Sequence, residues 1–229
     1  MVSIAPISQQ IWDMKYRLKG ADGAPVDRTL EESWRRVARA LAAREADPAA
    51  RLVLNDYDVE YDTPDMDRKR LAVLKVCERM KKAGVPLDAL GVEAHLSVGR
   101  HEFSAKKLRD FLREAAQLGL EIQITELDCT DELAPADPDA RDLAIAEEYR
   151  RFLEVALDEP AVKMLVTWGL SDRYSWIVRH EDNEEKQRKD LERPLPFDRD
   201  LKPKLAWTAL AQCIAAAPKR DMAADRAAA

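Results

Sequence analysis

The sequence predicts an α/β protein of the (β/α)8 TIM-barrel type, here a partial barrel of about five βα units. Short apolar runs typical of buried strands begin near residues 52, 90, 121 and 163. Each interval between these runs contains one segment with the apolar period of a helix. This alternation indicates right-handed βαβ units and a parallel sheet, either doubly wound or closed as a barrel. The seven glycines form no glycine-rich nucleotide-binding turn, which favours the barrel.

The N-terminal half of the chain contains two predicted helices and two predicted strands. A capping box at Thr29 begins the first helix, and Asp47-Pro48 ends it. The first strand covers 51–57, and the second runs from Leu90 to Ala94. Between the strands, a helix from about Asp67 to Lys82 places four apolar residues on one face: Leu71, Leu74, Cys77 and Met80.

The third strand is the run GLEIQITELD, from Gly119 to Asp128. Ser104 is predicted to cap the helix before it, and Gly119 to end that helix. Alternating leucine and isoleucine residues predict a short strand whose last residues carry Glu126 and Asp128 to its C-terminal end. The C-terminal ends of parallel strands are where barrel enzymes place working residues. We therefore expect the candidate site here, although acidic residues after a strand also commonly cap a helix or stay solvated.

The remaining chain is predicted to form two helices, a strand and a loop. Asp137-Pro138 begins a long helix, whose predicted apolar side comprises Leu143, Ala146, Phe152, Leu153 and Ala156. A strand follows over 162–168, then a long charged loop over 169–202, and Pro203 opens the last helix. One domain is expected over 1–218, followed by a disordered tail over 219–229.

Composition excludes several classes of function. The net charge is −6 and the pI is about 5.3, without a basic stripe, so nucleic-acid binding is not expected. No apolar run reaches the roughly 18 residues of a membrane span, so no membrane association is expected. The N-terminus lacks the pattern of a signal peptide, and localisation stays open. Three widely separated cysteines predict neither a zinc site nor a disulfide framework, and no metal or cofactor is expected.

Polar and aromatic residues follow the predicted strands and should share one rim of the barrel. They are Asn55, Asp56, His95, Glu126, Asp128 and Trp168. Carboxylates can attack or protonate a glycosidic linkage, and indole faces such as those of Trp168 and Trp176 stack on sugar rings. Taken alone, His95 is more often a core residue than a catalyst. Together, these residues indicate carbohydrate cleavage.

Five motifs in order resemble the second half of family-10 glycoside hydrolases, which are retaining endo-1,4-β-xylanases with an eight-stranded β/α barrel. They are AREADPAARLVLNDYDVEYDT, GVPLDALGVEAHL, ITELD, VTWGLSDRYSW and RPLPFDRDLKPKLAW. The resemblance spans about residues 43 to 207. It implies hydrolysis of β-1,4-xylan or xylo-oligosaccharides.

The resemblance also implies roles for individual residues. Glu126 corresponds to the catalytic nucleophile, His95 to the histidine that hydrogen-bonds it, and Asp128 to the residue that orients the histidine. Trp168 and Trp176 correspond to walls of the sugar subsite beside the scissile bond. Asn55 and Asp56, from the NDY motif, correspond to rim residues that support the site.

The chain departs from the family pattern at two positions. The family's acid/base glutamate lies in a motif that resembles Ile11 to Arg17 here, so Arg17 occupies the acid/base position and no acid/base carboxyl is found. Arginine is a poor acid, and loss of acid/base catalysis costs about 10² to 10⁴-fold in rate. Glu93 replaces the usual glutamine and is expected to place a second charge beside Glu126.

Three readings of the function follow. The first is a xylanase-like barrel fragment that keeps the nucleophile but has weak or no activity on xylan. The second is a non-catalytic carbohydrate-binding or assembly module that uses the two tryptophans, and the third is a sugar enzyme of another barrel family. The first three barrel strands have no counterpart before Trp12. Either the gene product is truncated, which the altered motif at Met14 to Arg17 favours, or a half barrel self-associates through its open edges.

Overall fold

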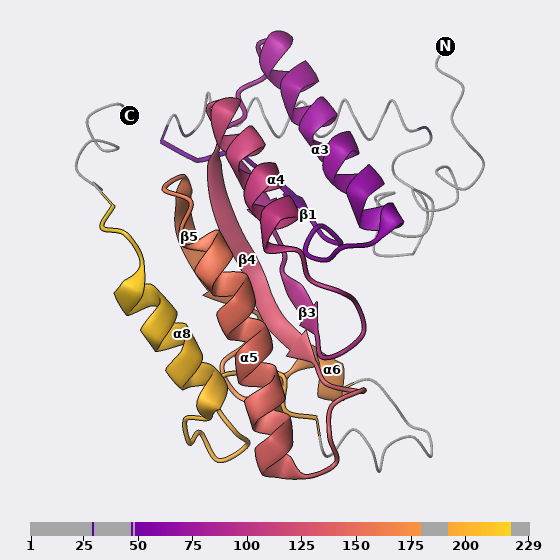
Figure 1. Ribbon diagram of the computed structural model, residues 1–229. Coiled ribbons are helices and arrows are strands. Elements are labelled where there is room, and N and C mark those ends of the chain that lie inside the picture. The colour runs from indigo at the N-terminus through magenta and orange to yellow at the C-terminus, as the bar shows by residue number, and fades with distance from the viewer. Residues whose placement is uncertain (1–28, 30–46, 48, 180–191, 221–229) are drawn as a thin grey trace. The chain divides into compact units, whose positions relative to one another are not determined.

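The computed structural model describes residues 29, 47, 49–179 and 192–220 (Figure 1). The chain divides into two compact units, Met1–Ala50 and Arg51–Ala229, and the described fold belongs to the second. The predicted first helix, apart from Thr29, and the acid/base position Arg17 lie outside the described residues.

The second unit is built on a parallel sheet, as predicted. Its strands are β1 (Val53–Asp56), β2 (Ala89–Val92), β3 (His95–Ser97), β4 (Glu121–Thr130) and β5 (Val162–Thr167). The order is β1-β2-β4-β3, and β5 also pairs with β4. All pairings are parallel. Because β2 and β3 both pair with β4, on successive stretches, they act as one strand with an interruption.

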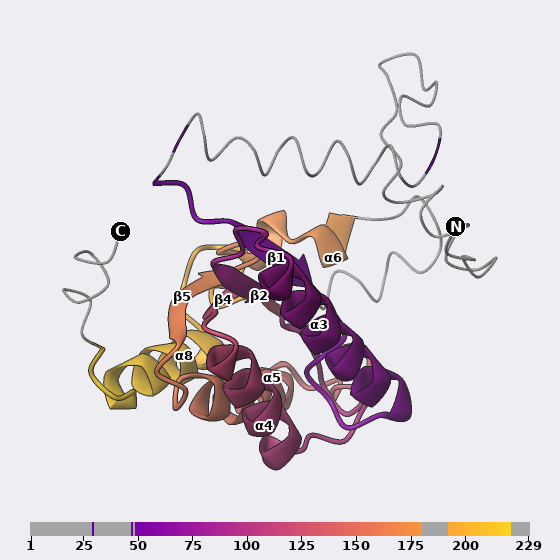
Figure 2. The ribbon, with the colours of Figure 1, turned by 90° about the horizontal axis from the view of Figure 1, so that it is seen from above.

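Four long helices cover one face of this sheet (Figure 2). They are α3 (Pro64–Lys82), α4 (Ala105–Gln117), α5 (Pro138–Ala156) and α8 (Leu205–Ala216). Each connects two neighbouring strands or follows the last one, which is the arrangement of a partial (β/α)8 barrel and confirms the predicted fold class. None of the described helices is long and apolar enough to cross a membrane.

Side-chain caps fix where the helices begin. The hydroxyl oxygen of Ser104 accepts a hydrogen bond from the amide of Lys107, and the carboxylate of Asp137 accepts one from the amide of Ala140. Both caps were predicted. Thr63 caps α3 in the same way, with a proline in the first turn, so this helix starts three residues before the predicted Asp67.

The predicted loop over 169–202 is wrong in part. It contains a short 3-10 helix, η3 (Asp172–Tyr174), and one helical turn, α6 (Trp176–Arg179). The last helix begins at Leu205, with Lys204 rather than Pro203 before it. A buried ion pair joins the start of α8 to η3, since the Lys204 ammonium donates to Asp172 at 2.8 Å. The same ammonium donates to the carbonyl of Arg193 at 2.6 Å.

The hydrophobic core lies between the sheet and the helices. From the sheet it includes the fully buried Leu90, Ile122 and Ile124, and from the helices Leu108, Leu112, Phe152 and Leu153. The prediction that Leu71 and Leu143 face the core is wrong, because their side chains are 58% and 63% exposed. On α3 the inward face includes Arg70 instead, whose guanidinium donates to the carbonyls of Val59 and Tyr61. These bonds set the rotation of the helix, which apolar spacing alone does not reveal.

The face of the sheet opposite the helices carries a row of four residues in register. Asn55 pairs with Gly91, Gly91 with Gln123, and Gln123 with Met164. Paired residues of parallel strands point to the same side. This face, here called the concave face, also carries apolar side chains that are more than one-third exposed: Val53, Met164 and Val166.

An interruption between β2 and β3 changes the strand alternation. Pairing stops at Val92 and Ile124 and resumes at His95 and Asp128. β4 has three residues between these pairs and the facing chain has two, which is the count of a β-bulge. Ala94 lies in this interruption in the left-handed conformation, with φ of 62°.

The bulge explains why the end of β4 was predicted incorrectly. The strand continues to Thr130, so Glu126 and Asp128 lie within it rather than at its end. Thr125 and Glu126 are both half-buried although they are adjacent, whereas Leu127 and Asp128 are both buried. Strict alternation would have placed Thr125 and Glu126 on opposite faces.

Gly91→Ala is expected to lower the free energy of unfolding by about 2 kcal/mol. An added methyl group would overlap Oδ1 of Asn55 and lie 3.2 Å from its Cα. In an Asn55→Ala background the same change should cost less than half as much, because the overlapping side chain is gone. Urea unfolding followed by circular dichroism measures both costs.

Gly84→Ala is the matched control for this cycle. Nothing lies within 4 Å of the added methyl group, and the φ of +70° gives a cost of about 1 kcal/mol that should not depend on Asn55. A Gly91→Ala cost that is equal in both backgrounds would contradict the close approach of the Asn55 side chain.

Candidate active site

Four ionisable side chains and one amide meet on the concave side of the sheet. Asn55 comes from β1, Glu93 from the interruption between β2 and β3, His95 from the start of β3, and Glu126 and Asp128 from β4. All five were predicted as site residues. Here they are called the carboxylate–histidine cluster.

His95 lies between carboxylates on both sides of its ring. Its Nδ1 is 2.8 Å from Oδ1 of Asp128. Its Nε2 is 3.4 Å from Oε2 of Glu93 and 3.5 Å from Oε2 of Glu126. Because a carboxylate accepts hydrogen bonds, Nδ1 donates its hydrogen to Asp128, and Nε2 faces the two glutamates.

Asn55 joins the two glutamates on their other side. Its Nδ2 donates to Oε1 of Glu93 at 3.2 Å and to Oε1 of Glu126 at 3.1 Å. Its Oδ1 accepts a hydrogen bond from the hydroxyl of Thr125 at 2.8 Å, which fixes the orientation of the amide. Thr125 was not predicted as a site residue, because alternation places it on the opposite face from Glu126.

Asp128 connects the cluster to an aromatic wall. Its side chain is fully buried, and Oδ2 accepts a hydrogen bond from the indole Nε1 of Trp176 at 2.7 Å. The Trp176 ring lies edge-on to the His95 ring, with centroids 5.6 Å apart. Trp176 is nevertheless 44% exposed, so part of its indole is available to a ligand.

Residues 25–213 match the sequence profile of glycosyl hydrolase family 10. The chain belongs to this family. Endo-1,4-beta-xylanase C of Paenibacillus barcinonensis is 38% identical over 176 residues, which cover 73% of this chain and 15% of that protein. Endo-1,4-beta-xylanase B of Thermotoga neapolitana is 33% identical over 168 residues, which cover 73% of this chain and 44% of that protein. Because the chain belongs to family 10, the third hypothesis, a sugar enzyme of another barrel family, is excluded.

Solved structures of family-10 xylanases share the fold. Xylanase 10B from Thermotoga petrophila RKU-1, crystallised in complex with xylobiose, superimposes with a TM-score of 0.66 and 29% identity. The match covers 79% of this chain and 51% of that one. Native xylanase 10B from Thermotoga maritima gives the same TM-score at 27% identity, with 57% of its chain covered. This family-10 chain therefore spans about half of the crystallised xylanases that it matches, and less of the curated relatives above.

Burial and charge shift the pKa values of two cluster residues. Burial lowers the pKa of His95, but its hydrogen bond to Asp128 and the charges of Asp128, Glu93 and Glu126 outweigh that effect and raise it. Burial raises the pKa of Glu93, and the charge of Glu126 raises it further. The predicted effect of a second carboxylate beside Glu126 is therefore seen on Glu93.

Glu60 binds the chain between β2 and β3, and it was not predicted as a site residue. It is 2% exposed, and its carboxylate accepts hydrogen bonds from the amide of Ala94 at 3.1 Å and of Val59 at 2.8 Å. Ala94 is the left-handed residue between Glu93 and His95, so this bond helps to place both cluster residues. Burial is the main reason that the pKa of Glu60 rises from 4.5 to about 7. A lone glutamate after a strand gives no periodic signal of such a role.

Two other predicted residues lie apart from the cluster. The carboxylate of Asp56 pairs with the Lys69 ammonium of α3 at 2.8 Å, and its charge contributes to the raised pKa of Glu93. Trp168 follows β5, where its amide donates to the carbonyl of Leu127 at 2.9 Å, and its side chain is 46% exposed. It is thus tied to the same stretch of β4 as the cluster.

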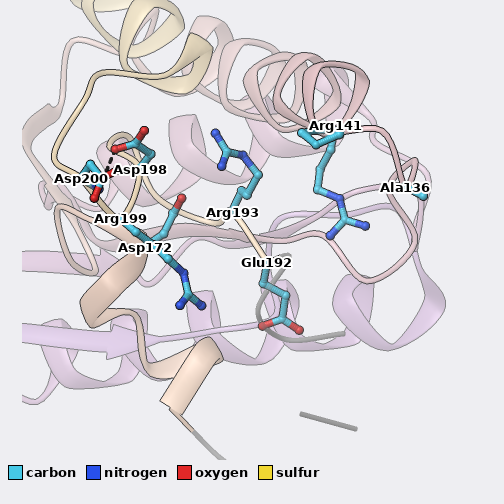
Figure 3. A pocket seen from close by; sticks show the side chains of 9 residues that line it. Ala136, Arg141, Asp172, Glu192, Arg193, Asp198, Arg199 and Asp200 are labelled. Atoms are coloured by element: carbon cyan, nitrogen blue, oxygen red, sulfur yellow. Dashed lines mark hydrogen bonds between the residues drawn. The ribbon is translucent and has the colours of Figure 1, made fainter. Parts of the chain in front are cut away.

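A cavity that includes none of the cluster is lined mostly by charged residues (Figure 3). Figure 3 shows Arg141 and Arg193 on its walls, with Asp172 nearby. Arg141 pairs with the buried Asp131 at 3.2 Å, and Arg193 binds Asp142 through two nitrogens. Arg141 and Arg193 are thus engaged in ion pairs, and the pair with Asp142 holds the chain at Arg193 to α5, so we assign this cavity a structural role.

The titration of Glu60 should make stability depend on pH. A carboxyl group with a folded pKa of about 7 keeps its proton where the unfolded chain has lost it, so the free energy of unfolding falls as pH rises from 4.5 to 7. The expected loss is about 3 kcal/mol. Glu60→Gln removes this titration and should flatten the dependence, measured by urea unfolding at pH 5 and pH 8. Glu114→Gln on α4 is the control and should keep the wild-type slope.

Proposed function

We propose that this chain carries the nucleophilic half of a retaining β-1,4-xylan hydrolase, with Glu126 as the nucleophile. The observation that supports it most is the hydrogen bonding around this carboxylate. Asn55 holds one oxygen at 3.1 Å, and the other faces His95 Nε2 at 3.5 Å. A carboxylate that is fixed in this way loses little orientation freedom when it attacks. The family-10 relatives are named as xylanases, which gives the substrate class.

In the proposed reaction, a Glu126 oxygen attacks the anomeric carbon while the bond to the leaving oxygen breaks. The product is a glycosyl ester on Glu126, which water then hydrolyses. His95, held by Asp128, positions the nucleophile and compensates part of its charge. Trp168 and Trp176 offer exposed indole faces for stacking on the sugar.

The remaining predicted residues have supporting roles in this proposal. Glu93 presents a carboxylate oxygen that can accept a hydrogen bond from a sugar hydroxyl. Asp56 supports the rim through Lys69 rather than through substrate. The acid/base carboxyl stays unassigned because Arg17 occupies the corresponding position by resemblance. Activity on xylan should therefore be lower by about 10² to 10⁴-fold than that of an intact site.

An aryl β-xylobioside with a dinitrophenolate leaving group tests the nucleophile directly. This leaving group departs without a proton, so no acid is needed for the first step. The wild-type chain should release about one equivalent in a burst, followed by slow turnover. Glu126→Gln should abolish the burst, measured by absorbance of the phenolate in a stopped-flow experiment.

Glu114→Gln is the control for this experiment, since it removes one carboxylate from α4 and should leave the burst unchanged. Near-UV circular dichroism on each sample establishes tertiary packing. A burst that persists in Glu126→Gln would contradict the assignment of the nucleophile, as would a packed wild-type chain without a burst.

The alternative proposal is a carbohydrate-binding or assembly module. The exposed fractions of Trp168 and Trp176, 46% and 44%, favour it, because such indoles can bind sugar without any bond cleavage. In this case Trp168→Ala should weaken binding of xylo-oligosaccharides about tenfold, while Glu126→Gln should leave it unchanged. Isothermal titration calorimetry measures both. Trp207→Ala, at a tryptophan on α8 that is 41% exposed, is the control; loss of binding in all three variants would count against a stacking platform.

Self-association through the open edges of the sheet stays part of this proposal. Exposed apolar side chains lie on the concave face, including Val53, Met164 and Val166. Others lie on the two outermost helices, with Leu71 and Val76 on α3 and Leu205 and Ile214 on α8. A closed barrel would bury such surfaces.

A further inference from the structure

Three cluster residues present atoms that metal ions bind. Nε2 of His95 and one carboxylate oxygen from each of Glu93 and Glu126 all lie within 4.8 Å of one another. Nitrogen and oxygen donors of these types are ligands for zinc and related divalent ions. Of the described residues, these three form the group with this property.

Each of the three donors is already oriented by a partner outside the group. Asp128 accepts the hydrogen on Nδ1 of His95 at 2.8 Å, which leaves Nε2 as the nitrogen that faces the glutamates. Asn55 donates to Oε1 of both Glu93 and Glu126. The Oε2 atoms therefore remain for a ligand. A carboxylate behind a coordinating histidine is the usual support of a protein metal site.

The distances fit a tetrahedral ion. Zinc bonds to nitrogen and oxygen of about 2.0 to 2.2 Å place two tetrahedral ligands about 3.3 to 3.5 Å apart. Nε2 of His95 is 3.4 Å from Oε2 of Glu93 and 3.5 Å from Oε2 of Glu126. The two glutamate oxygens lie within 4.8 Å of each other.

Charge also favours a cation at this point. Glu93 and Glu126 share one neutral amide donor, Asn55, and face one imidazole. A divalent ion would offset the repulsion between the two carboxylates. All three side chains are only partly buried, so an ion can enter from the concave face.

We propose that Glu93, His95 and Glu126 bind a divalent transition-metal ion of the zinc class, with a fourth position open to water or to a sugar hydroxyl. Glu93 is the residue that completes the set, and the spacing of the three cysteines gives no signal of it. An ion bound to Oε2 of Glu126 would occupy the nucleophile. The ion and a glycosyl group therefore compete for Glu126, a consequence that rests on the proposed function, whereas the ion site itself does not.

Zinc binding to the metal-free full chain tests the site. Competition with a chromophoric chelator gives the stoichiometry and the dissociation constant. The wild-type chain should bind one equivalent of zinc. Glu93→Gln should bind none, or bind it with a dissociation constant more than about tenfold higher. Glu93→Gln keeps the length of the side chain and the Oε1 position that accepts from Asn55. Glu114→Gln, which also removes one negative charge, should bind zinc as the wild type does.

Cobalt provides a readout on the wild-type chain alone. Co²⁺ in a four-coordinate site absorbs visible light much more strongly than six-coordinate aqueous Co²⁺, so intense bands that zinc displaces would support the proposal even if the variants fail to fold. A spectrum like that of aqueous Co²⁺ would overturn it. So would the absence of stoichiometric zinc binding by the wild type, or equal dissociation constants for the wild type and a folded Glu93→Gln.

The competition has its own measurement. Zinc at saturating concentration should suppress the dinitrophenolate burst of the wild type, and a chelator should restore it. If the metal-free chain shows no burst but binds zinc, the proposed hydrolase function fails and the ion site stands. If the burst is unaffected by zinc and no equivalent binds, the ion site fails and the hydrolase function stands.

Discussion

The bulge in β4 is the constraint on which the geometry of the site depends. Because β4 has one residue more than the chain opposite it, Thr125 and Glu126 can both face the concave side. The same interruption places Glu93 and His95 on either side of the left-handed Ala94. A regular ladder would send alternate residues to opposite faces and could not gather these four side chains. Glu60, buried below, holds the interruption through the Ala94 amide.

Charge is the second constraint, and it is unusually one-sided. Glu93, Glu126 and Asp128 surround one imidazole, while Lys69, whose charge acts on Glu93, pairs with Asp56. The Asn55 amide offsets part of this repulsion, and in our proposals a sugar or a metal ion does so as well. The Asn55 amide uses the Oε1 atoms, whereas a glycosyl group and a metal ion would both need Glu126 and so would exclude one another. In our proposals, Glu93 adds a carboxylate that favours cation binding over sugar chemistry.

Much of this structure could be predicted from sequence because its signals are local. Strand positions followed from short apolar runs, and the starts of α4 and α5 followed from Ser104 and Asp137-Pro138. The joint position of Asn55, His95, Glu126 and Asp128 followed from the rule that parallel strands end at one rim. What failed depends on contacts between distant segments. The rotation of α3 is set by Arg70 bonds to a loop, and the phase of β4 is set by its bulge.

The hydrogen bond between Trp176 and Asp128 has a consequence for how this site can be observed. The indole Nε1 of Trp176 donates to Oδ2 of Asp128, and the other oxygen of Asp128 binds His95. The indole therefore lies in the electric field of the whole cluster. Indole fluorescence shifts in colour and yield with the local electric field. A change of protonation, the arrival of an ion or the formation of a glycosyl ester alters that field within a few ångströms of the ring. Trp176 is thus a native optical probe of the site, sensitive to events that leave the backbone unmoved.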